Sequence, residues 1–481
     1  MQQCDIGMIG LGTMGRNLVL NIGDKGFSAV GYDKDFNKLK LLEKEAKDRK
    51  ILAAKSLEEF FGMLKKPRAF MMLVPAGAAV DAIIEEALPY MEKGDIIIDG
   101  GNSHYTDTER RIKDLEGRGI HFMGVGISGG EQGARLGPSM MPGGSPEAYS
   151  RLKNIFEAVA AKADNEPCVA YMGRGSAGHY VKMVHNGIEY ALIQLISESY
   201  HLMKTSLGLS NDELAGTFEK WDKEELHSFL IEITGRIFRM EEMEQEGRGK
   251  TGDKNRRRLI DLILDRARQK GTGKWTSQDA MDIQVPVPTI DAAVVMRDLS
   301  ADRDTRLKYS KVLHGPAYSY KGSRDEFIQR LKNALYFSMI ISYAQGMDLL
   351  KKASESYSYG VDLKKVASIW RGGCIIRASL LQDILEAYGK EENMHSLMAS
   401  GKFSGMLNRM QEDIRFVVIN AVTLGIPIPA FSASLSYFDS YRSQWLPANL
   451  VQAQRDFFGA HTYERIDKEG IFHTEWLKGE K

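Results

Sequence analysis

The sequence DIGMIGLGTMGRNLVLNIGDKG at residues 5–26 indicates how the first part of the chain folds. The apolar run DIGMIG has the length of a buried strand, and RNLVLNIGDKG continues with helical spacing. Between them, Gly10 permits a tight turn, Gly12 lets the backbone approach a pyrophosphate, and Gly15 lets helix and strand pack closely. The helix N-terminus then offers free N–H groups to the phosphates. This stretch therefore predicts a dinucleotide-binding unit.

An acidic residue stands where such a unit binds a ribose. Asp33 follows the second apolar run, FSAVGY, eighteen residues after Gly15. A carboxylate at this place can accept a hydrogen bond from a ribose 2′-hydroxyl, so the expected cofactor is NAD, with NADP possible. The residues expected to contact it are Gly10, Leu11, Gly12, Thr13, Met14, Gly15, Asp33, Lys34, Val74, Pro75, Ala76 and Asn102. The ten histidines show no HExxH motif or paired-ligand spacing, so no metal site is expected.

Strand and helix patterns alternate through the first 176 residues. The runs DIGMIG, FSAVGY, AFMMLV, GDIIIDGG and IHFMGVG have the length and composition of buried strands. Helical patterns such as FNKLKLLEKEAK and VDAIIEEALPYMEK lie between them. This alternation predicts an α/β, Rossmann-type, doubly wound domain over residues 1–176 with a mostly parallel sheet. The glycine-rich sequence MGRGSAG at 172–178 marks its end.

Beyond that boundary we find no convincing strand run, and long segments carry apolar residues at helical spacing. We expect a large all-α domain over residues 177–435. It has the marks of a duplicated unit, since two apolar helical segments are followed at similar distances by LGLSNDELAGTFEKW and YGVDLKKVASIW. A doubled helical unit would suit a large buried core.

Two further segments differ from the helical pattern. Residues 241–258 are strongly charged and are expected to form an exposed excursion. Residues 436–481 are polar, aromatic and rich in turns, which is typical of a tail that lies over another surface. We therefore expect a C-terminal tail after the helical domain.

The composition limits the class of protein. A chain of 481 residues is long enough for two or three domains, and its 64 basic and 64 acidic side chains give no signal for nucleic acid or an acidic membrane surface. Three scattered cysteines without a CxxC pair suggest neither a disulfide framework nor a zinc site. With no 18-residue apolar run and no leader pattern, we expect a cytoplasmic protein that binds neither membrane nor nucleic acid.

The sequence VKMVHNGIEY at 181–190 places four polar residues on one helix face. Lys182, His185, Asn186 and Glu189 have the spacing i, i+3, i+4 and i+7. They could form a solvated face, but the rest of this helix is apolar nearly all round, and buried charges are costly unless they are paired or used. Gly187, among them, suggests close approach by another segment. The apolar surroundings favour a catalytic set.

The chain resembles the decarboxylating 6-phosphogluconate dehydrogenase family almost from end to end. Five stretches in order carry the resemblance: IIDGGNS at 97–103, ISGGEQGARLGPSMMPGG at 127–144, VKMVHNGIEY, QKGTGKWT at 269–276 and QAQRDFFGAHTYE at 452–464. The resemblance implies a cytosolic homodimer in which the helical domain of residues 177–435 binds the substrate and forms the dimer, while the tail reaches into the partner subunit. It also implies oxidation of 6-phosphogluconate to ribulose 5-phosphate and CO2 with hydride transfer to NAD(P).

The resemblance further implies a role for each site residue. Lys182 would be the general base and Glu189 the general acid. The substrate contacts would be Asn102, Ser128, Gly129, Gly130, His185, Asn186, Tyr190, Lys270, Arg297, and Arg455 and His461 from the other subunit. A lysine can act as base only when it is neutral, so the pKa of Lys182 must be lowered by desolvation among the apolar residues of its helix.

Two positions depart from the family pattern on the cofactor side. The family's usual aromatic-Asn-Arg-Thr is here Tyr32-Asp33-Lys34-Asp35, and a usual lysine is Pro75. We therefore expect preference for NAD, although Lys34 could pair with the 2′-phosphate of NADP. Two alternatives stay open. One is a related β-hydroxyacid dehydrogenase without a phosphorylated substrate, and the other is a non-catalytic dinucleotide sensor.

Overall fold

A computed structural model describes residues 3–242, 257–391 and 394–477. The five apolar runs of the first part are strands of one seven-stranded sheet, which confirms the predicted Rossmann-type fold. The strand order is β3-β2-β1-β4-β5-β6-β7, in which β1 to β6 run parallel and β7 runs antiparallel to β6. The strands are β1 (Ile6–Ile9), β2 (Ala29–Tyr32), β3 (Ile51–Ala53), β4 (Ala69–Met72), β5 (Ile96–Asp99), β6 (His121–Ser128) and β7 (Ser139–Gly144).

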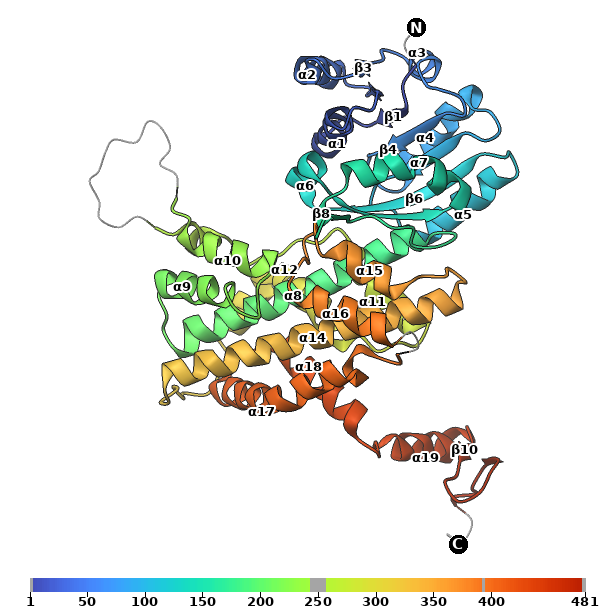
Figure 1. Ribbon diagram of the computed structural model, residues 1–481. Helices are drawn as coiled ribbons and strands as arrows, with labels where there is room; N and C mark the ends of the chain where they lie inside the picture. Colours follow the sequence, from blue (N-terminus) through green and yellow to red (C-terminus); the bar gives the residue numbers. More distant parts are fainter. Residues whose placement is uncertain (1–2, 243–256, 392–393, 478–481) are drawn as a thin grey trace, which may run out of the picture.

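Helices cover both faces of this sheet (Figure 1), so its central strands are buried throughout and mostly apolar. One face packs against α1 (Thr13–Asp24), α2 (Phe36–Ala46), α6 (Gly130–Leu136) and α7 (Pro146–Val159), and the other against α3 (Leu57–Gly62), α4 (Ala78–Ala87) and α5 (Tyr105–Glu116). The sequence VDAIIEEALPYMEK predicted a helix over residues 80–93, but the observed helix α4 ends at Ala87. A 3-10 turn, η1 (Leu88–Tyr90), follows and contains Pro89. Proline lacks the N–H that a continuing helix needs.

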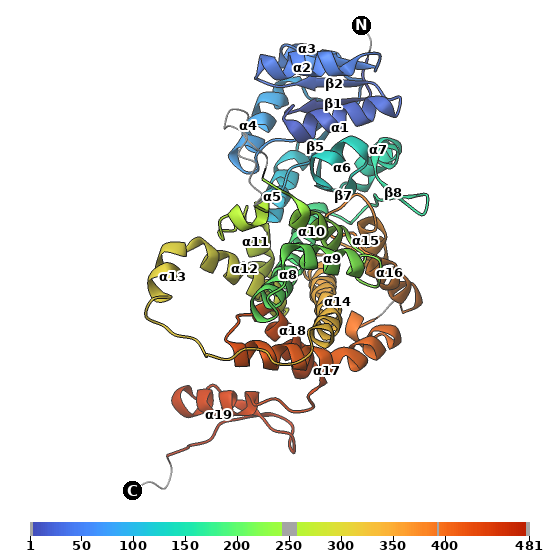
Figure 2. The same ribbon diagram turned by 90° about the vertical axis from the view of Figure 1, so that its left-hand side faces the viewer.

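The helical domain is built around two long, buried helices that lie side by side, α8 (Ala177–Ser206) and α14 (Arg324–Ser356). Figure 2 shows shorter helices packed around them, in agreement with the predicted all-α domain. A short hairpin, β8 (Lys162–Ala163) and β9 (Glu166–Pro167), precedes this domain. The other helices are α9 (Asn211–Trp221), α10 (Phe229–Arg239), η2 (Leu259–Leu262), α11 (Thr272–Asp282), α12 (Pro288–Ala301), α13 (Arg303–Tyr309), α15 (Leu363–Trp370), α16 (Leu380–Lys390), η3 (Leu397–Ala399), α17 (Gly401–Leu424) and α18 (Pro429–Arg442).

The order of these helices supports the proposed duplication. A long helix is followed by two short ones twice, as α8–α9–α10 and as α14–α15–α16. Trp221 and Trp370 end the second helix of each set, and both side chains are buried in the core. Within the part of the chain that the structure describes, no helix is long and apolar enough to cross a membrane.

The two domains meet where the start of α8 packs on the edge of the sheet. A Cβ atom added to Gly178 would lie 2.2 Å from the carbonyl oxygen of Gly124 in β6 and 2.3 Å from that of Met141 in β7. Backbone atoms therefore surround Gly178, and α8 can approach the sheet only because this residue has no side chain. This contact places Lys182, one turn further along α8, beside the sheet.

Replacing Gly178 with Ala is expected to destabilise the protein by about 3 kcal/mol or more, because backbone on two strands would have to move. The control is Gly216→Ala in α9, where an added Cβ would meet nothing within 4 Å. That change should stabilise the protein by about 0.4–1 kcal/mol. Urea denaturation followed by circular dichroism measures both effects. Equal unfolding midpoints for Gly178→Ala and the wild type would contradict the close packing described here.

The tail leaves the helical domain at the end farthest from the sheet (Figures 1 and 2). Helix α18 continues past position 435 because Tyr437 and Phe438 are buried in the core, so we place the start of the tail after Arg442. The tail contains α19 (Ala448–Gly459) and a hairpin, β10 (Tyr463–Glu464) and β11 (Ile471–Phe472). The buried carboxylate of Asp456 holds these elements together, since it accepts hydrogen bonds from the residues that follow, Thr462, His473, Thr474 and Trp476.

The charged excursion falls mostly outside the described residues. At its described ends, Glu241 pairs with Arg258 through a backbone bridge and a side-chain ion pair of 3.4 Å. Residues 243–256, on which the prediction of an exposed excursion rests, lie outside the described part of the chain.

Candidate active site

Lys182 lies on the buried side of α8, against the sheet. A Cβ added to Gly126 of β6 would stand 2.3 Å from the Cβ of Lys182, so the lysine stem crosses the strand at a position that only glycine permits. The residue is 6% exposed. Burial lowers the pKa of its ammonium group, while the nearby carboxylate of Glu189 opposes this shift. The lowered pKa favours the neutral amine of Lys182.

His185 connects Lys182 with the substrate-side residues. Its Nδ1 lies 3.4 Å from Lys182 Nζ and 3.0 Å from Asn186 Oδ1, and its Nε2 lies 3.3 Å from the hydroxyl of Ser128. Burial holds the pKa of the imidazole well below its ordinary value, so the ring is neutral. Nδ1–H therefore donates to the amide oxygen of Asn186, and Nε2 accepts from Ser128. The ring orients both neighbours without adding a positive charge next to Lys182.

Helix α11 completes this side of the site. Asn186 donates through Nδ2 to the hydroxyl of Thr272, 3.1 Å away. The suspected close approach at Gly187 is real, since an added Cβ there would stand 2.6 Å from Cγ2 of Thr276. The Thr276 hydroxyl also donates to the carbonyl oxygen of Met183 at 2.9 Å. These contacts hold α11 tightly along the polar face of α8 that carries Lys182 and Asn186.

Glu189 lies one turn beyond His185 and is partly accessible. Its side chain is 22% exposed, and its Oε2 is 4.0 Å from His185 Nδ1. Burial raises the pKa of this carboxyl group, while Lys182 and Arg297 oppose the shift. The pKa shifts of Lys182 and Glu189 therefore have opposite signs, and each favours the neutral form of its group. A lysine and a glutamate whose pKa values are shifted in these directions, on one helix face, have the chemistry that a base and an acid need for proton transfer.

Ser128, Gly129 and Gly130 form the turn between β6 and α6. Gly129 has a φ of +116°, and a Cβ on it would lie 2.5 Å from the carbonyl oxygen of Gly373. A Cβ on Gly130 would meet nothing within 4 Å, so this side of the turn is open. The turn thus presents unobstructed backbone beside Ser128, as a polyhydroxylated substrate would require.

The predicted phosphate-binding residues come together only in part. The guanidinium carbon of Arg297 lies 3.4 Å from the ring centroid of Tyr190. Lys270 is exposed, and its neighbour Gln269 donates to Asp298, the residue after Arg297, at 2.7 Å. Tyr190, Lys270 and Arg297 therefore lie on adjoining segments at one end of the site.

The remaining two predicted residues are elsewhere in the same chain. Arg455 and His461 lie in the tail, where both are exposed, and Arg455 donates to Gln452 at 3.0 Å. Figures 1 and 2 show the tail at the opposite end of the molecule from the sheet. One chain alone thus does not bring these residues to Lys182.

The dinucleotide end has the shape that the glycine motif requires. A Cβ on Gly15 would stand 1.9 Å from the carbonyl oxygen of Gly10, so the third glycine allows the close packing of α1 on β1. A Cβ on Gly12 would meet nothing within 4 Å, which leaves the N-terminus of α1 open to a pyrophosphate. Beside it is a cavity of about 280 Å³ lined by Gly10, Asp33, Lys34, Val74 and Pro75, among others. These residues fit a bound dinucleotide.

Both charged cofactor candidates are already paired. Asp33 accepts the backbone N–H of Leu11 at 2.7 Å and the ammonium group of Lys38 at 3.1 Å. Lys34 forms a 2.7 Å ion pair with Glu86 of α4. The cavity wall therefore carries two carboxylates and two ammonium groups, of which the sequence analysis identified only Asp33 and Lys34.

Comparisons with known proteins match this site and fold. Residues 5–173 match the family described as the NAD binding domain of 6-phosphogluconate dehydrogenase, and residues 178–476 match its C-terminal domain. The chain belongs to the 6-phosphogluconate dehydrogenase family. Its identity to the decarboxylating enzyme of Lactococcus lactis is 52% over 478 residues, or 99% of each chain.

Two further members of the family bear on the cofactor. A Bacillus subtilis relative, 51% identical over 99% of this chain and 100% of its own, is described as NADP(+)-dependent and decarboxylating. A solved 6-phosphogluconate dehydrogenase from Plasmodium falciparum is 46% identical, with a TM-score of 0.93 over 98% of this chain and all of that one. Its structures were determined in the apo form, with NADP+ and with 6-phosphogluconate.

Several contacts in the structure of the present chain were not predicted from its sequence. Thr272 lies inside the quoted QKGTGKWT motif, so its neighbourhood was identified but its bond to Asn186 was not. Trp370 packs edge-on against His185, with ring centroids 5.6 Å apart, although the two residues are far apart in the chain. The pairing of Lys38 with Asp33 could have been predicted, because Lys38 lies in the first turn of the helix that follows Asp33. Nothing in the sequence around Glu86 indicates that it pairs with Lys34, which is 52 residues away in the chain.

Proposed function

We propose that this chain catalyses the oxidative decarboxylation of 6-phosphogluconate to ribulose 5-phosphate and CO2, with Lys182 as general base and Glu189 as general acid. The observation that carries the proposal is the pairing of these two residues on one face of α8, with pKa shifts of opposite sign. His185 lies between them and is bonded to Ser128 and Asn186. The runner-up, a β-hydroxyacid dehydrogenase for an unphosphorylated substrate, gives no reason for the cluster of Tyr190, Lys270 and Arg297.

Lys182 acts in two steps. In the first, its neutral amine takes the proton of the substrate hydroxyl at the carbon β to the carboxylate. A bound nicotinamide supplies the hydride acceptor. The resulting β-keto acid loses CO2 more easily when charge on its carbonyl oxygen is stabilised, and the Lys182 ammonium group is then placed to stabilise it. Because buried side chains surround the amine, this interaction is stronger than it would be in water.

Glu189 completes the reaction. Loss of CO2 leaves an enediol once the Lys182 ammonium group gives its proton to the former carbonyl oxygen. The protonated carboxyl group of Glu189 then delivers a proton to the enediol carbon, while the neutral amine of Lys182 takes back the hydroxyl proton. The partial exposure of Glu189 allows it to regain a proton from solvent between turnovers. The nearby Arg297 stabilises the carboxylate that is formed when the proton leaves.

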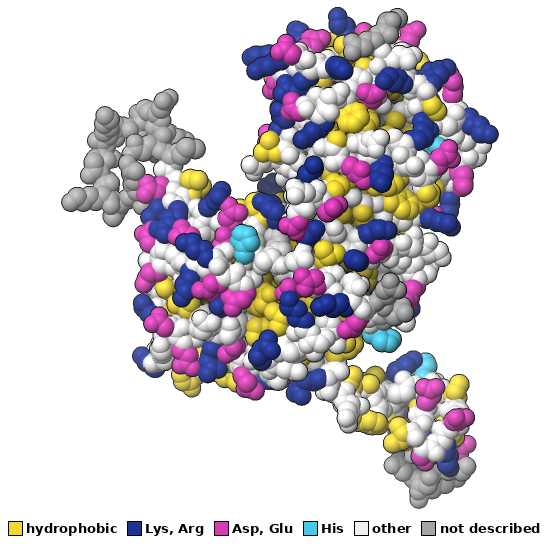
Figure 3. All heavy atoms as spheres, viewed as in Figure 1, with side chains coloured by type: hydrophobic (Ala, Val, Ile, Leu, Met, Phe, Trp, Pro, Cys, Tyr) yellow, Lys and Arg dark blue, Asp and Glu magenta, His cyan; other side chains and the backbone are white. Residues whose placement is uncertain are grey.

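The substrate is held from two subunits in this proposal. Asn102, Ser128, Gly129, Gly130, His185 and Asn186 bind the sugar-acid end, and Tyr190, Lys270 and Arg297 bind the phosphate. The partner subunit's Arg455 and His461 complete the phosphate site. The projecting tail supports this arrangement, since it carries exposed apolar side chains that a monomer leaves uncovered, including Trp445, Leu450 and Phe458. Figure 3 shows hydrophobic side chains on the tail next to the main body.

The test is turnover of 6-phosphogluconate with separate detection of CO2 and of the reduced dinucleotide. Equal amounts of both products are expected. Reduction without CO2, or faster turnover of an unphosphorylated β-hydroxyacid, would favour the runner-up. Dinucleotide binding without turnover of either substrate would favour a non-catalytic sensor.

We propose NAD as the preferred dinucleotide, although the B. subtilis relative is described as NADP(+)-dependent. Two ion pairs in the cavity wall, Asp33–Lys38 and Lys34–Glu86, support this. Burial acts to raise the pKa of Asp33, but backbone hydrogen bonds and Lys38 lower it overall, so the group is ionised. The 2′-phosphate of NADP adds roughly two negative charges, which the four paired side chains do not balance.

Asp33→Asn is expected to lower the ratio of kcat/KM for NAD over NADP by about tenfold, equivalent to about 1.4 kcal/mol. The amide removes one negative charge from the cavity wall and frees Lys38 for the 2′-phosphate. Asp114→Asn on the exposed face of α5 makes the same charge change outside the cavity and should leave the ratio unaltered. A wild-type enzyme that prefers NADP would contradict the proposal.

The pH profile of kcat/KM is expected to be bell-shaped. Activity rises with pH as Lys182 loses its proton, at a pKa below the ordinary lysine value because of burial. It falls at higher pH as Glu189 ionises, at a pKa above the ordinary glutamate value, also because of burial. In Glu189→Gln the residual activity should lose the alkaline limb, since an amide does not titrate there. An alkaline limb that persists in this variant would assign that limb to another group.

We further propose that the enzyme acts in the cytoplasm and binds neither nucleic acid nor membrane. The three cysteines, Cys4, Cys168 and Cys374, are buried and unpaired, which suits a reducing compartment. Figure 3 shows basic and acidic side chains interspersed over the face that it draws, as expected for a protein whose ligands are small molecules.

A further inference from the structure

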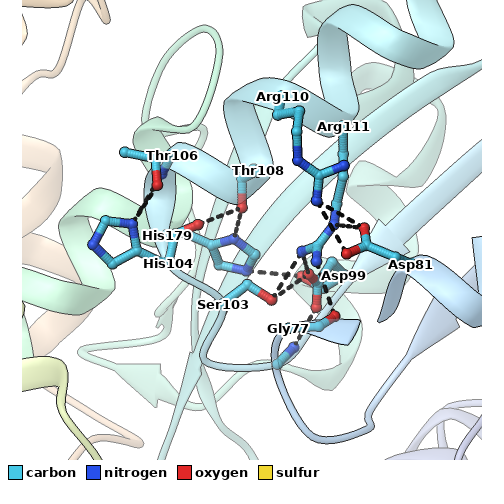
Figure 4. Close-up of polar contacts among 11 residues, drawn as sticks. Gly77, Asp81, Asp99, Ser103, His104, Thr106, Thr108, Arg110, Arg111 and His179 are labelled. Carbon is cyan, nitrogen blue, oxygen red and sulfur yellow. Dashed lines mark hydrogen bonds and ion pairs between the residues drawn. The ribbon is translucent and has the colours of Figure 1, made fainter. Parts of the chain in front are cut away.

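A buried polar network connects the two loops that border the dinucleotide site (Figure 4). At its centre is Arg111 of α5, which is 2% exposed. Its Nε donates to Asp81 at 2.8 Å, and its Nη2 donates to the carbonyl oxygen of Gly77 at 3.1 Å. Its Nη1 lies 3.4 Å from the carboxylate of Asp99 and from the hydroxyl of Ser103. One guanidinium group thus contacts two separate loops.

The first of these loops carries Asn102. The carboxylate of Asp99 accepts the backbone N–H of Gly101 at 3.0 Å and the hydroxyl of Ser103 at 2.6 Å. These two bonds close the turn of residues 99–103 around Asn102, which the proposed function assigns to both substrate and dinucleotide. Asp99 is fully buried, so its negative charge depends on Arg111 for a counter-charge.

The second loop consists of residues 74–77 and leads into α4. Val74 and Pro75 line the cavity, and Gly77 with Asp81 holds the guanidinium group of Arg111. The loops also approach each other directly, because a Cβ on Gly101 would lie 3.3 Å from the carbonyl oxygen of Val74. Their separation is therefore set by Arg111 together with this contact.

The same network reaches the catalytic helix. His179 of α8, one turn before Lys182, contacts the carbonyl oxygen of Asp99 through Nε2 at 3.0 Å and the hydroxyl of Thr108 through Nδ1 at 2.6 Å. A carbonyl oxygen only accepts, so Nε2 carries the proton and Nδ1 accepts from Thr108. Desolvation lowers the pKa of this buried ring, which agrees with a neutral imidazole.

We propose that Arg111 is a positioning residue that holds residues 74–77 and 99–103 at a fixed separation, so that the dinucleotide and Asn102 are aligned with Lys182. The inference rests on the proposed function for the roles of Asn102 and Lys182. Its chemical basis is the planar fork of arginine, which donates in several directions at once, whereas a lysine ammonium group is a single point charge. Neither Arg111 nor its partners Asp81 and Asp99 belong to the proposed catalytic set.

The test is Arg111→Lys, which keeps the buried positive charge beside Asp99 but cannot contact both loops. The dissociation constant for NADH, from fluorescence titration, and the KM for the dinucleotide are expected to rise by about 10- to 100-fold, typical of ångström-scale misplacement. The matched control is Arg110→Lys, since Arg110 directly precedes Arg111, is half exposed and also pairs with Asp81. It should leave both constants unchanged.

Two results would overturn the proposal. One is a wild-type NADH affinity and KM in Arg111→Lys. The other is a variant in which only the fraction of folded, active enzyme falls, while the dissociation constant for NADH and the KM for the dinucleotide stay at their wild-type values. A purely structural role of Arg111 would produce that result. The NADH titration needs no substrate, so it tests Arg111 even if 6-phosphogluconate proves not to be turned over, in which case only the proposed function fails.

Discussion

Replacing Lys182 with Met is expected to lower kcat by about 10²- to 10⁴-fold, the usual contribution of a general base, while dinucleotide affinity stays nearly unchanged. The methionine side chain has a similar length and suits the buried position, so the fold should tolerate it. The first chemical step then lacks a proton acceptor. Because the glycine turn of β1–α1 that fits the dinucleotide is formed by a different segment, binding should persist. Stopped-flow kinetics and a fluorescence titration with NADH measure the two properties.

The control is another lysine of the same helix. Lys204 lies in the last turn of α8, is partly exposed and pairs with Asp261 at 3.7 Å, so Lys204→Met should keep close to wild-type turnover. A Lys182→Met enzyme with near-normal turnover would remove Lys182 from the mechanism. A variant that loses dinucleotide affinity to the same extent would instead place Lys182 in cofactor binding.

Mixing Lys182→Met subunits with Arg455→Ala subunits is expected to restore activity that neither variant has alone. If each site uses Lys182 of one subunit and the tail of its partner, a mixed dimer has one intact site and one doubly altered site. Random exchange then leaves about one quarter of all sites intact. The reason lies in the geometry, since Arg455 is exposed on a tail that extends away from Lys182 of its own chain.

Exchange of subunits must be confirmed separately, for example by mass spectrometry of differently tagged chains. The control mixes Lys182→Met with Glu189→Gln. Both residues come from α8 of the same subunit, so in a mixed dimer one site lacks Lys182 and the other lacks Glu189. A mixed dimer should recover no activity in that pairing. Confirmed exchange without recovery in the first mixture would show that Arg455 acts within its own chain or not at all.

The predicted site followed from local spacing wherever the contacts are local. Lys182, His185, Asn186 and Glu189 share a face because they lie within two turns of one helix, and the structure places them together. The ends of strands β1 and β2 could be predicted equally well, since Gly10 and Asp33 directly follow apolar residues. The antiparallel strand β7 was not predicted, because SMMPGG contains proline and two glycines, which are depleted in strands.

Contacts between distant segments could not be derived in the same way. The pairing of Lys34 with Glu86 and the joining of two loops by Arg111 depend on how α4 and α5 pack on the sheet. A charged residue on a helix gives no sign of which distant carboxylate it will meet. The tail illustrates the same limit, because its composition predicted a separate segment but not that α18 would continue to Arg442.

The sequence by itself determined the alternation of five strands with helices in the first domain, the glycine turn at Gly10, Gly12 and Gly15, and the polar face of α8. Each of these depends on periodicity or steric fit within a few residues of the chain. Only the tertiary structure decided which charges are buried and paired, and hence the opposite pKa shifts of Lys182 and Glu189. Those shifts arise from desolvation, which depends on every segment packed around a group rather than on its neighbours in sequence.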